Sequence, residues 1–140
     1  HATFEQQENG NVVFDGIIAL AMAILAYGVP VGLGTDTGCP YITHYDMWRE
    51  LYYYVKYCGV TPAFALYSAT LLNAQLAGLG NETGSIEEGK AADLIVCDRD
   101  PLADLSALRT LRMVVRQGWR VENPAPKKMP EVERELDRFL

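Results

Sequence analysis

The chain has 140 residues, of which 49% are hydrophobic and 21% are charged, and its net charge is −6. These proportions are typical of a globular protein and exclude a disordered one, and the length is enough for one domain with a sizeable core. A complete (β/α)8 barrel is excluded, because it needs about 250 residues. The acidic balance leaves no basic stripe to neutralise phosphates, so we expect no nucleic-acid partner.

Three cysteines are widely spaced along the chain: Cys39, Cys58 and Cys97. They form no C-x-x-C pair and therefore indicate neither a zinc knuckle nor a disulfide framework, so we expect a reducing, cytoplasmic location. Residues 16–31 form an apolar stretch, but Gly28 and Pro30 interrupt it and no positively charged segment precedes it. We therefore expect neither a signal peptide nor a membrane span.

The first predicted elements are a helix and a strand, after polar residues 1–11 that favour neither. Residues 12–27 predict a helix that is apolar almost all round, which is typical of a helix buried on more than one side. Gly28 ends this helix. The continuous apolar run over residues 29–33 predicts a strand of a parallel sheet covered on both faces.

Two further helices are predicted next. Residues 46–57 mix apolar and charged side chains and form the second helix. Thr61-Pro62 begins the third helix, with a hydroxyl cap and a proline at the first helical position, and Gly78 ends it. The order helix, strand, helix, helix fits the last units of a βα barrel.

Short strands are predicted in the second half of the chain, over residues 92–97, 111–117 and 119–121. Gln117-Gly118 is the expected hairpin turn, and residues 123–126 form a linker. Residues 130–140 predict a short, highly charged helix. Its apolar stripe could dock on a partner surface, and it consists of Val132, Leu136 and Phe139 or Leu140.

Asp36 is the main candidate for chemistry. It lies in a loop that begins at Gly34 and ends at Gly38, directly after the predicted strand. Enzymes of the α/β class keep catalytic groups at the C-terminal ends of strands, and the glycines allow a tight turn beside the carboxylate. From this pattern alone, Asp36 could equally cap the next helix or bond its own turn. Both interpretations stay open at this point.

Three segments together resemble the metal-dependent amidohydrolase superfamily, especially its imidazolonepropionase- and prolidase-like members. They are the Asp36 loop, the Ser68–Ala74 segment, which is similar to the A-T-x-N-A helix of the family, and the glycine-bounded turn and strand over residues 84–96. The resemblance covers residues 11–121. It implies an α/β fold in which residues 1–80 are the last helix-strand-helix units of a (β/α)8 barrel. Residues 81–123 would form part of a small flanking β-sandwich domain, and residues 124–140 a C-terminal linker and short helix.

The resemblance also implies a function for the intact protein. The chain would be the C-terminal portion of a hydrolase that cleaves a C–N bond in a small linear or cyclic amide, with one or two divalent metals, zinc being the expected one. Asp36 would bind or border the metal, take a proton from the metal-bound water and pass it to the leaving nitrogen. His44, in the loop before the second helix, would lie near the substrate, although a histidine there is otherwise a capping or surface residue.

The family's other metal ligands do not occur in this sequence. The upstream His-x-His pair, the bridging lysine and the two later histidines are all missing, and His1 has no context that gives it a role. We therefore expect no metal in this chain alone and no activity.

Two alternatives remain open. The chain could be a non-catalytic domain that self-associates, because an unpaired apolar strand over residues 29–33 is a template for pairing, and a twofold dimer is then expected. Alternatively, Asp36-Thr37-Gly38 is the triplet of aspartic proteases, which need two aspartates that share a proton. Only a homodimer would supply both, and the long helices on either side are unlike that nearly all-β class.

Overall fold

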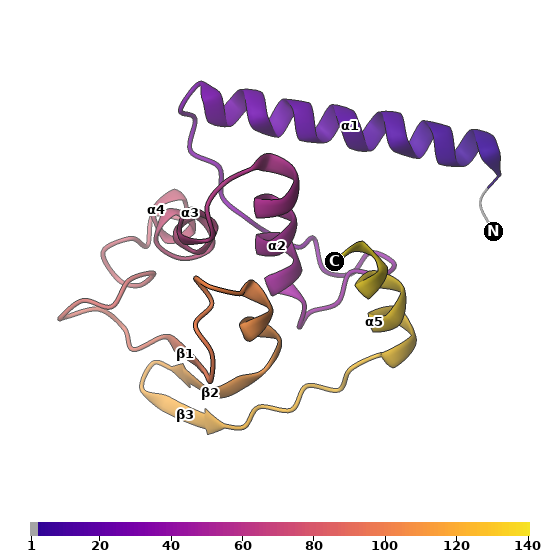
Figure 1. Cartoon of the computed structure of the whole chain (residues 1–140). Helices are drawn as coiled ribbons and strands as arrows, with labels where there is room; N and C mark the ends of the chain where they lie inside the picture. Colours follow the sequence, from indigo (N-terminus) through magenta and orange to yellow (C-terminus); the bar gives the residue numbers. More distant parts are fainter. Residues whose placement is uncertain (1–2) are drawn as a thin grey trace.

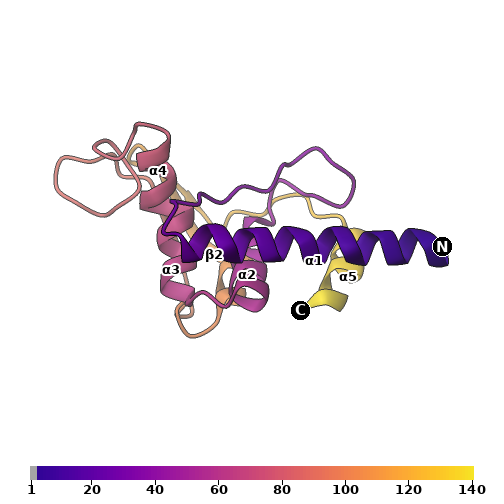
Figure 2. The same cartoon turned by 90° about the horizontal axis from the view of Figure 1, so that it is seen from above.

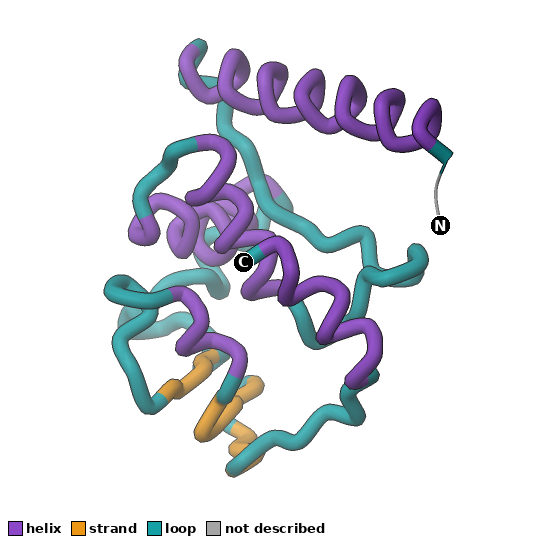
Figure 3. Tube along the Cα trace, turned by 45° about the vertical axis from the view of Figure 1, so that its right-hand side comes forward, coloured by secondary structure: helices purple, strands orange, loops and turns teal. Residues whose placement is uncertain are grey.

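The computed structural model describes residues 3–140 and contains both helices and strands. Figure 1 shows the order of the elements along the chain. The helices are α1 (Phe4–Ala26), α2 (Met47–Cys58), α3 (Pro62–Tyr67), α4 (Asn73–Leu76) and α5 (Pro130–Leu136). The strands are β1 (Leu94–Cys97), β2 (Leu111–Arg116) and β3 (Trp119–Glu122). Helices α2 to α4 lie between α1 on one side and the sheet on the other (Figures 1 and 3).

Helix α1 begins eight residues earlier than the predicted start at residue 12, since its first residue is Phe4. Thr3 caps it: the Thr3 hydroxyl accepts from the Gln6 amide at 3.2 Å, and the Thr3 amide donates to Gln6 Oε1 at 2.8 Å. This capping box satisfies two backbone groups and extends the helix through the polar segment. The prediction that residues 1–11 favour no element was therefore wrong for residues 4–11.

The predicted burial of α1 is wrong for this chain, because none of its residues is buried. It touches the rest of the molecule mainly through α2, where the rings of Phe14 and Tyr57 meet edge to face at 5.0 Å. Figures 1 and 2 show α1 along one side, with its N-terminal turns projecting beyond the other helices. By length and composition alone, α1 is also the one helix of residues 3–140 that is long and apolar enough to cross a membrane.

The strand predicted over residues 29–33 is not formed, since this segment is extended but irregular. A strand needs a neighbour to accept and donate its backbone hydrogen bonds. Within the described residues the sheet contains only β1, β2 and β3, and none of them lies against this segment. The physical reason for the error is therefore the lack of a partner strand.

The second and third predicted helices are confirmed, and they build the core. Gly59, with φ of 69°, ends α2, and the Thr61 hydroxyl caps α3 by accepting from the Phe64 amide at 3.1 Å. A π-helical turn over Ser68–Leu72 joins α3 to α4 without interrupting the helical path. The core cluster combines these helices with a 3₁₀ turn after β1, and its buried members are Leu51, Tyr54, Ala65 and Leu105.

The three predicted strands are also confirmed, as an antiparallel sheet in the order β1-β2-β3. Gln117 and Gly118 connect β2 to β3, and both have positive φ, 48° and 84°. That combination is the type I′ turn that suits the twist of a hairpin. The Asp93 carboxylate accepts from the Gln117 amide at 2.7 Å, so this aspartate stabilises the hairpin.

Candidate active site

The loop that carries Asp36 adopts unusual backbone conformations. Asp36 has φ of 53° and Tyr41 has φ of 66°. Aspartate tolerates the left-handed region better than most residues do, but a bulky tyrosine there is an outlier. Each such residue costs on the order of 1–3 kcal/mol and persists only where the surrounding structure holds it. The backbone strain in this loop is therefore concentrated at Asp36 and shortly after it.

The segment that leads into Asp36 is held by the side chain of Asn73. The Leu33 amide donates to Asn73 Oδ1 at 2.9 Å, and Asn73 Nδ2 donates to the Leu33 carbonyl at 2.8 Å. One side-chain amide thus pairs both backbone groups of Leu33, as a neighbouring strand would. Gly32 leaves room for this contact, because a Cβ there would collide with Asn73 Oδ1. Asn73 and Gly32 together fix the direction in which the chain approaches Asp36.

The Asp36 carboxylate is exposed to solvent, three residues before an exposed free thiol. The Cys39 thiol lies 3.7 Å from Asp36 Oδ2 and can donate a weak hydrogen bond to it. The hydroxyls of Thr35 and Thr37 bond to each other at 2.6 Å. Because none of these contacts neutralises the carboxylate, Asp36 remains available to accept a proton or to bind a cation.

His44 is exposed at the far end of the same loop. Its ring packs edge to face on the ring of Tyr45, with centroids 5.1 Å apart. No hydrogen bond or ion pair joins His44 to Asp36 among residues 3–140. Within that range there is also no group of three or more His, Cys, Asp or Glu side chains that could hold a metal ion. The structure thus brings Asp36 and Cys39 together, and leaves His44 separate.

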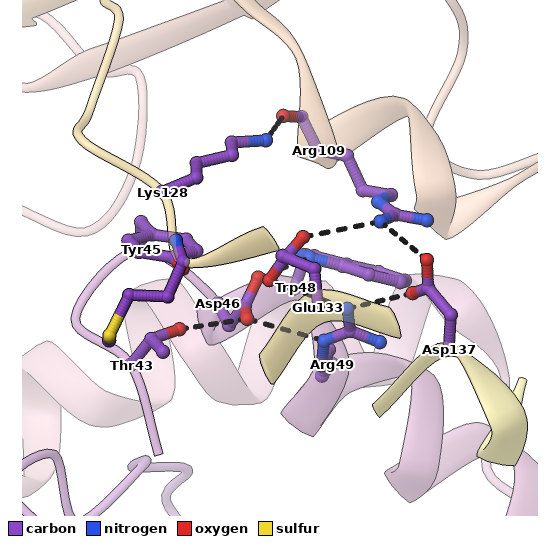
Figure 4. Close-up of polar contacts among 10 residues, drawn as sticks. Thr43, Tyr45, Asp46, Trp48, Arg49, Arg109, Lys128, Glu133 and Asp137 are labelled. Carbon is purple, nitrogen blue, oxygen red and sulfur yellow. Dashed lines mark hydrogen bonds and ion pairs between the residues drawn. The ribbon is translucent and has the colours of Figure 1, made fainter. Parts of the chain in front are cut away.

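Beside this loop lies a buried ionic network that sequence reasoning missed (Figure 4). Arg49 is at its centre and is only 3% exposed. Its Nη2 donates to Asp137 Oδ1 at 2.8 Å, and its Nε lies 3.3 Å from Asp46 Oδ2. Arg109 donates to Glu133 at 3.3 Å and to Asp137 at 3.1 Å. Two guanidinium groups and three carboxylates therefore join α2, the turn after β1 and α5.

The network shifts two carboxyl groups in opposite directions. Burial opposes ionisation of Asp46, but hydrogen bonding with Glu133, Thr43 and Trp48 outweighs it, and so the pKa of Asp46 is lowered. Burial and the neighbouring Asp46 carboxyl raise the pKa of Glu133, and the arginines offset this only in part. The pair thus favours an ionised Asp46 beside a Glu133 that keeps its proton to higher pH than usual.

One sequence signal could have revealed the network. Glu133 and Asp137 are four residues apart, so they share one face of a helix. Two carboxylates on one helix face call for a cationic partner, yet the prediction for this helix relied on its apolar stripe. Of that stripe, Val132 and Leu136 are only partly buried and Phe139 is 57% exposed.

Comparison with known proteins assigns the chain to a family. The amidohydrolase family matches residues 5–121, which include the Asp36 loop and all of α1 and the sheet except Phe4 and Glu122. The chain belongs to the amidohydrolase family. Among curated relatives, it is 27% identical over 134 residues to imidazolonepropionase of Thermoplasma volcanium, in an alignment that covers 84% of this chain and 33% of that protein.

Solved structures agree with this assignment. A putative prolidase from Bifidobacterium longum is 41% identical and superposes with a TM-score of 0.91, over 98% of this amidohydrolase chain and 34% of that one. A Xaa-Pro dipeptidase crystallised with methionine in its active site is 34% identical, with a TM-score of 0.70, over 76% of this chain and 25% of that one. The chain therefore spans about a quarter to a third of the length of these three relatives.

Members of the amidohydrolase family generally bind divalent metals. An adenosine deaminase from Xanthomonas campestris, solved with bound zinc, is 26% identical with a TM-score of 0.62, over 85% of this chain and 32% of that one. Because a hydrolytic zinc site needs about three protein ligands, the described residues do not by themselves fit a metal centre. Within residues 3–140, no ion pair involves the Asp36 carboxylate, whose side-chain contact is with the Cys39 thiol.

Proposed function

We propose that this chain is the C-terminal part of a metal-dependent amidohydrolase that cleaves a C–N bond in a small linear or cyclic amide. The observation that carries this proposal is the 41% identity and TM-score of 0.91 with a putative prolidase, over nearly the whole chain. Residues 1–80 would complete a (β/α)8 barrel and residues 81–123 would belong to a flanking β domain. Residues 29–33 would become the last barrel strand once partner strands lie beside them.

Asp36 is proposed as the proton-transferring carboxylate. It is exposed, no ion pair involves it within residues 3–140, its φ is 53°, and Asn73 holds the segment that leads to it through two hydrogen bonds to Leu33. A carboxylate in such a place can accept a proton from the attacking water and return it to the leaving nitrogen. As a metal donor it would contribute one ligand, and the remaining ligands would come from the rest of the barrel.

His44 is proposed as a substrate-contacting residue. It lies on the loop that leaves Asp36, it is exposed, and its ring packs edge to face with the ring of Tyr45. A free imidazole on such a loop can donate or accept a hydrogen bond to a polar group of an amide substrate. This role asks for contact with substrate and does not require contact with Asp36.

A chimera tests the proposed function. The corresponding third of the Bifidobacterium longum protein is replaced by this chain, and the product is assayed for hydrolysis of Xaa-Pro dipeptides and of other small amides. We expect hydrolysis that a chelator abolishes and that added zinc restores. A folded chimera without metal-dependent amide hydrolysis would contradict the proposal, and the unaltered relative serves as the control.

A second candidate, self-association of the isolated chain, is favoured by the exposed apolar surface of α1. Its exposed side chains include Val12, Val13, Ile17 and Leu20, with exposed fractions of 59–67%. An apolar cavity of about 480 Å³ separates α1 from α2. Contiguous apolar surface of this kind is rare on soluble monomers, and a second copy would cover it. Because α1 lies within the family match, we propose that it is a helix of the fold and not a membrane span.

Sedimentation at micromolar concentration tests self-association. We expect a dimer, and we expect Ile17→Glu to shift it to monomer because the new charge would have to be buried. Glu8→Gln, at an exposed polar position of the same helix, is the matched control. A monomeric unaltered chain would contradict the dimer.

A further inference from the structure

Helix α5 lies beyond residue 121, where the family match ends, and yet it is fastened to the region around the candidate site. We call residues 128–139 the C-terminal strap. The strap contacts α2 through the ion pair between Arg49 and Asp137 at 2.8 Å, and Glu133 Oε1 lies 3.6 Å from the same guanidinium. At the C-terminal end of the strap, the Lys56 ammonium donates to the Phe139 carbonyl at 2.6 Å. These contacts fasten the strap to α2, which lies within the family match.

The strap also reaches the loop that follows Asp36. The Met129 amide donates to the Tyr45 hydroxyl at 2.8 Å, directly beside His44. Arg49 provides a second, indirect connection between the strap and the loop. It pairs with Asp46, and Asp46 in turn accepts from the Thr43 hydroxyl at 2.8 Å. Both residues that flank His44 in the sequence, Thr43 and Tyr45, are thus tied to the strap directly or through one intermediate pair (Figure 4).

Packing alone does not fix this loop. A cavity of about 100 Å³ lies beside the loop, and its lining includes Tyr41, Ile42 and Thr43 of the loop, Arg49 of α2 and Leu136 of the strap. Side chains that face a void lack the close contacts that would hold them in place. The position of the loop therefore depends on the polar contacts that cross to the strap.

We propose that the C-terminal strap is a positioning element for residues 39–46, that it acts through Arg49 and Asp46, and that it thereby sets how His44 meets the substrate. Arg49 is the positioning residue in this arrangement and is not itself in contact with the substrate. The part of the inference that concerns substrate rests on the proposed function. The part that concerns loop order does not.

Amide hydrogen exchange on the 140-residue chain tests the loop. The variant is Glu133→Gln with Asp137→Asn, which keeps the shape of both side chains and removes the two strap charges that face Arg49, while Asp46 still pairs with it. Glu135→Gln is the matched control, because Glu135 pairs only with Arg138 within the strap, at 2.8 Å. We expect exchange over residues 39–46 to become faster by about tenfold or more, the effect of losing a hydrogen bond to a charged group. The amides of β1 and β2 should keep their rates.

Trp48 reports on the network in the same samples. Its indole donates to Asp46 at 3.0 Å, and the guanidinium groups of Arg49 and Arg109 lie 4.7 and 4.9 Å from its ring centroid. The second tryptophan, Trp119, is 82% exposed, so Trp119→Phe isolates the Trp48 fluorescence. A changed Trp48 emission with unchanged exchange over residues 39–46 would overturn the proposal. Equal acceleration in the loop and in the sheet would also overturn it, because the network would then stabilise the whole fold and not the loop.

Steady-state kinetics of the chimera tests the substrate contact. Asp137→Asn should raise KM several-fold with little change in kcat, because it loosens a binding loop and leaves Asp36 in place. A fall in kcat at constant KM would contradict the positioning role, since simple loss of folded enzyme gives that result. An inactive unaltered chimera would instead refute the proposed function, and the exchange experiment would still decide whether the strap orders the loop.

Discussion

Gly32 and Asn73 share one contact, and the energetic coupling between them can be measured. Alanine at position 32 would place its Cβ against Asn73 Oδ1 and 3.1 Å from Leu76 Cδ1. The amide of Asn73 must then move and give up its two hydrogen bonds to Leu33. Each such bond contributes about 0.5–1.5 kcal/mol net, so we expect Gly32→Ala to cost about 1–3 kcal/mol of unfolding free energy.

The double variant separates this contact from other effects. Asn73→Ala removes the same two bonds and should cost about 1–3 kcal/mol as well. Once Asn73 is alanine, the Cβ at position 32 meets only the flexible end of Leu76. Gly32→Ala should then be neutral, or stabilise the chain by about 0.4–1 kcal/mol through the unfolded state. The expected coupling is therefore about 1–3 kcal/mol in favour of the double variant.

Urea unfolding, followed by circular dichroism, gives the double-mutant cycle from the unaltered chain, Gly32→Ala, Asn73→Ala and the double variant. Gly34→Ala is the matched control in the same segment, because a Cβ there meets no atom within 4 Å and its φ is not positive. It should be neutral or slightly stabilising. If the costs of Gly32→Ala and Asn73→Ala simply add within about 0.5 kcal/mol, the two residues do not share a contact and the reasoning is refuted.

Four further outcomes are expected. Because the pKa of Asp46 is lowered in the folded state, ionised Asp46 adds to the free energy of unfolding above about pH 4, and this contribution is lost as the pH falls. In Asp46→Asn, the free energy of unfolding measured in urea should therefore fall less steeply toward acid pH. The raised pKa of Glu133 has the opposite effect. Protonated Glu133 adds to the free energy of unfolding at low pH, and this contribution is lost as the pH rises above about 4.3. The free energy of unfolding of Glu133→Gln should not show this decrease. Leu51→Ala, at a position 2% exposed, should cost about 2–5 kcal/mol in the same assay, and a cost below about 1 kcal/mol would show that this cluster is not the core. Elemental analysis of the chelator-treated chain should find well below one zinc per molecule, because Asp36 and His44 supply fewer than the about three ligands needed, and a stoichiometric metal would contradict this.

Local signals in the sequence were sufficient for the elements that local contacts define. Thr61-Pro62 specifies the start of α3 through a hydroxyl cap and a fixed proline φ. Gln117-Gly118 specifies the hairpin because both residues adopt positive φ. These features involve residues within a few positions of one another, so the sequence contains all the information they need.

Features that depend on distant residues could not be predicted in the same way. The run over residues 29–33 has the composition of a buried strand, but the amide and carbonyl of Leu33 bond to Asn73, forty residues away. Arg49 and Asp137 are eighty-eight residues apart, and the sequence around each of them does not indicate that they form an ion pair. The start of α1 is a different case, because the Thr3–Gln6 capping box is a local sequence pattern that predicts a helix start at this point.

The same distinction between local and distant contacts applies to the candidate site. Asp36 could be singled out because its glycine-flanked loop follows an apolar run, and the family match includes that loop. The strain at Asp36 and Tyr41 could not be foreseen, because backbone dihedrals outside glycine depend on the contacts that hold them. The network at Asp46 and Glu133 was missed because its members come from three separate elements.

The most direct test of the central claim, that Asp36 transfers the proton in an amidohydrolase site, is the turnover of the Asp36→Asn chimera with metal bound. The asparagine keeps the shape and removes the proton acceptor, so kcat should fall by roughly 10²–10⁴-fold while the protein stays folded. Asp98→Asn, at a carboxylate 69% exposed in a surface pair with Arg112, should keep near-normal turnover. If Asp36→Asn also keeps near-normal turnover, Asp36 is not the proton-transferring group and the central claim fails.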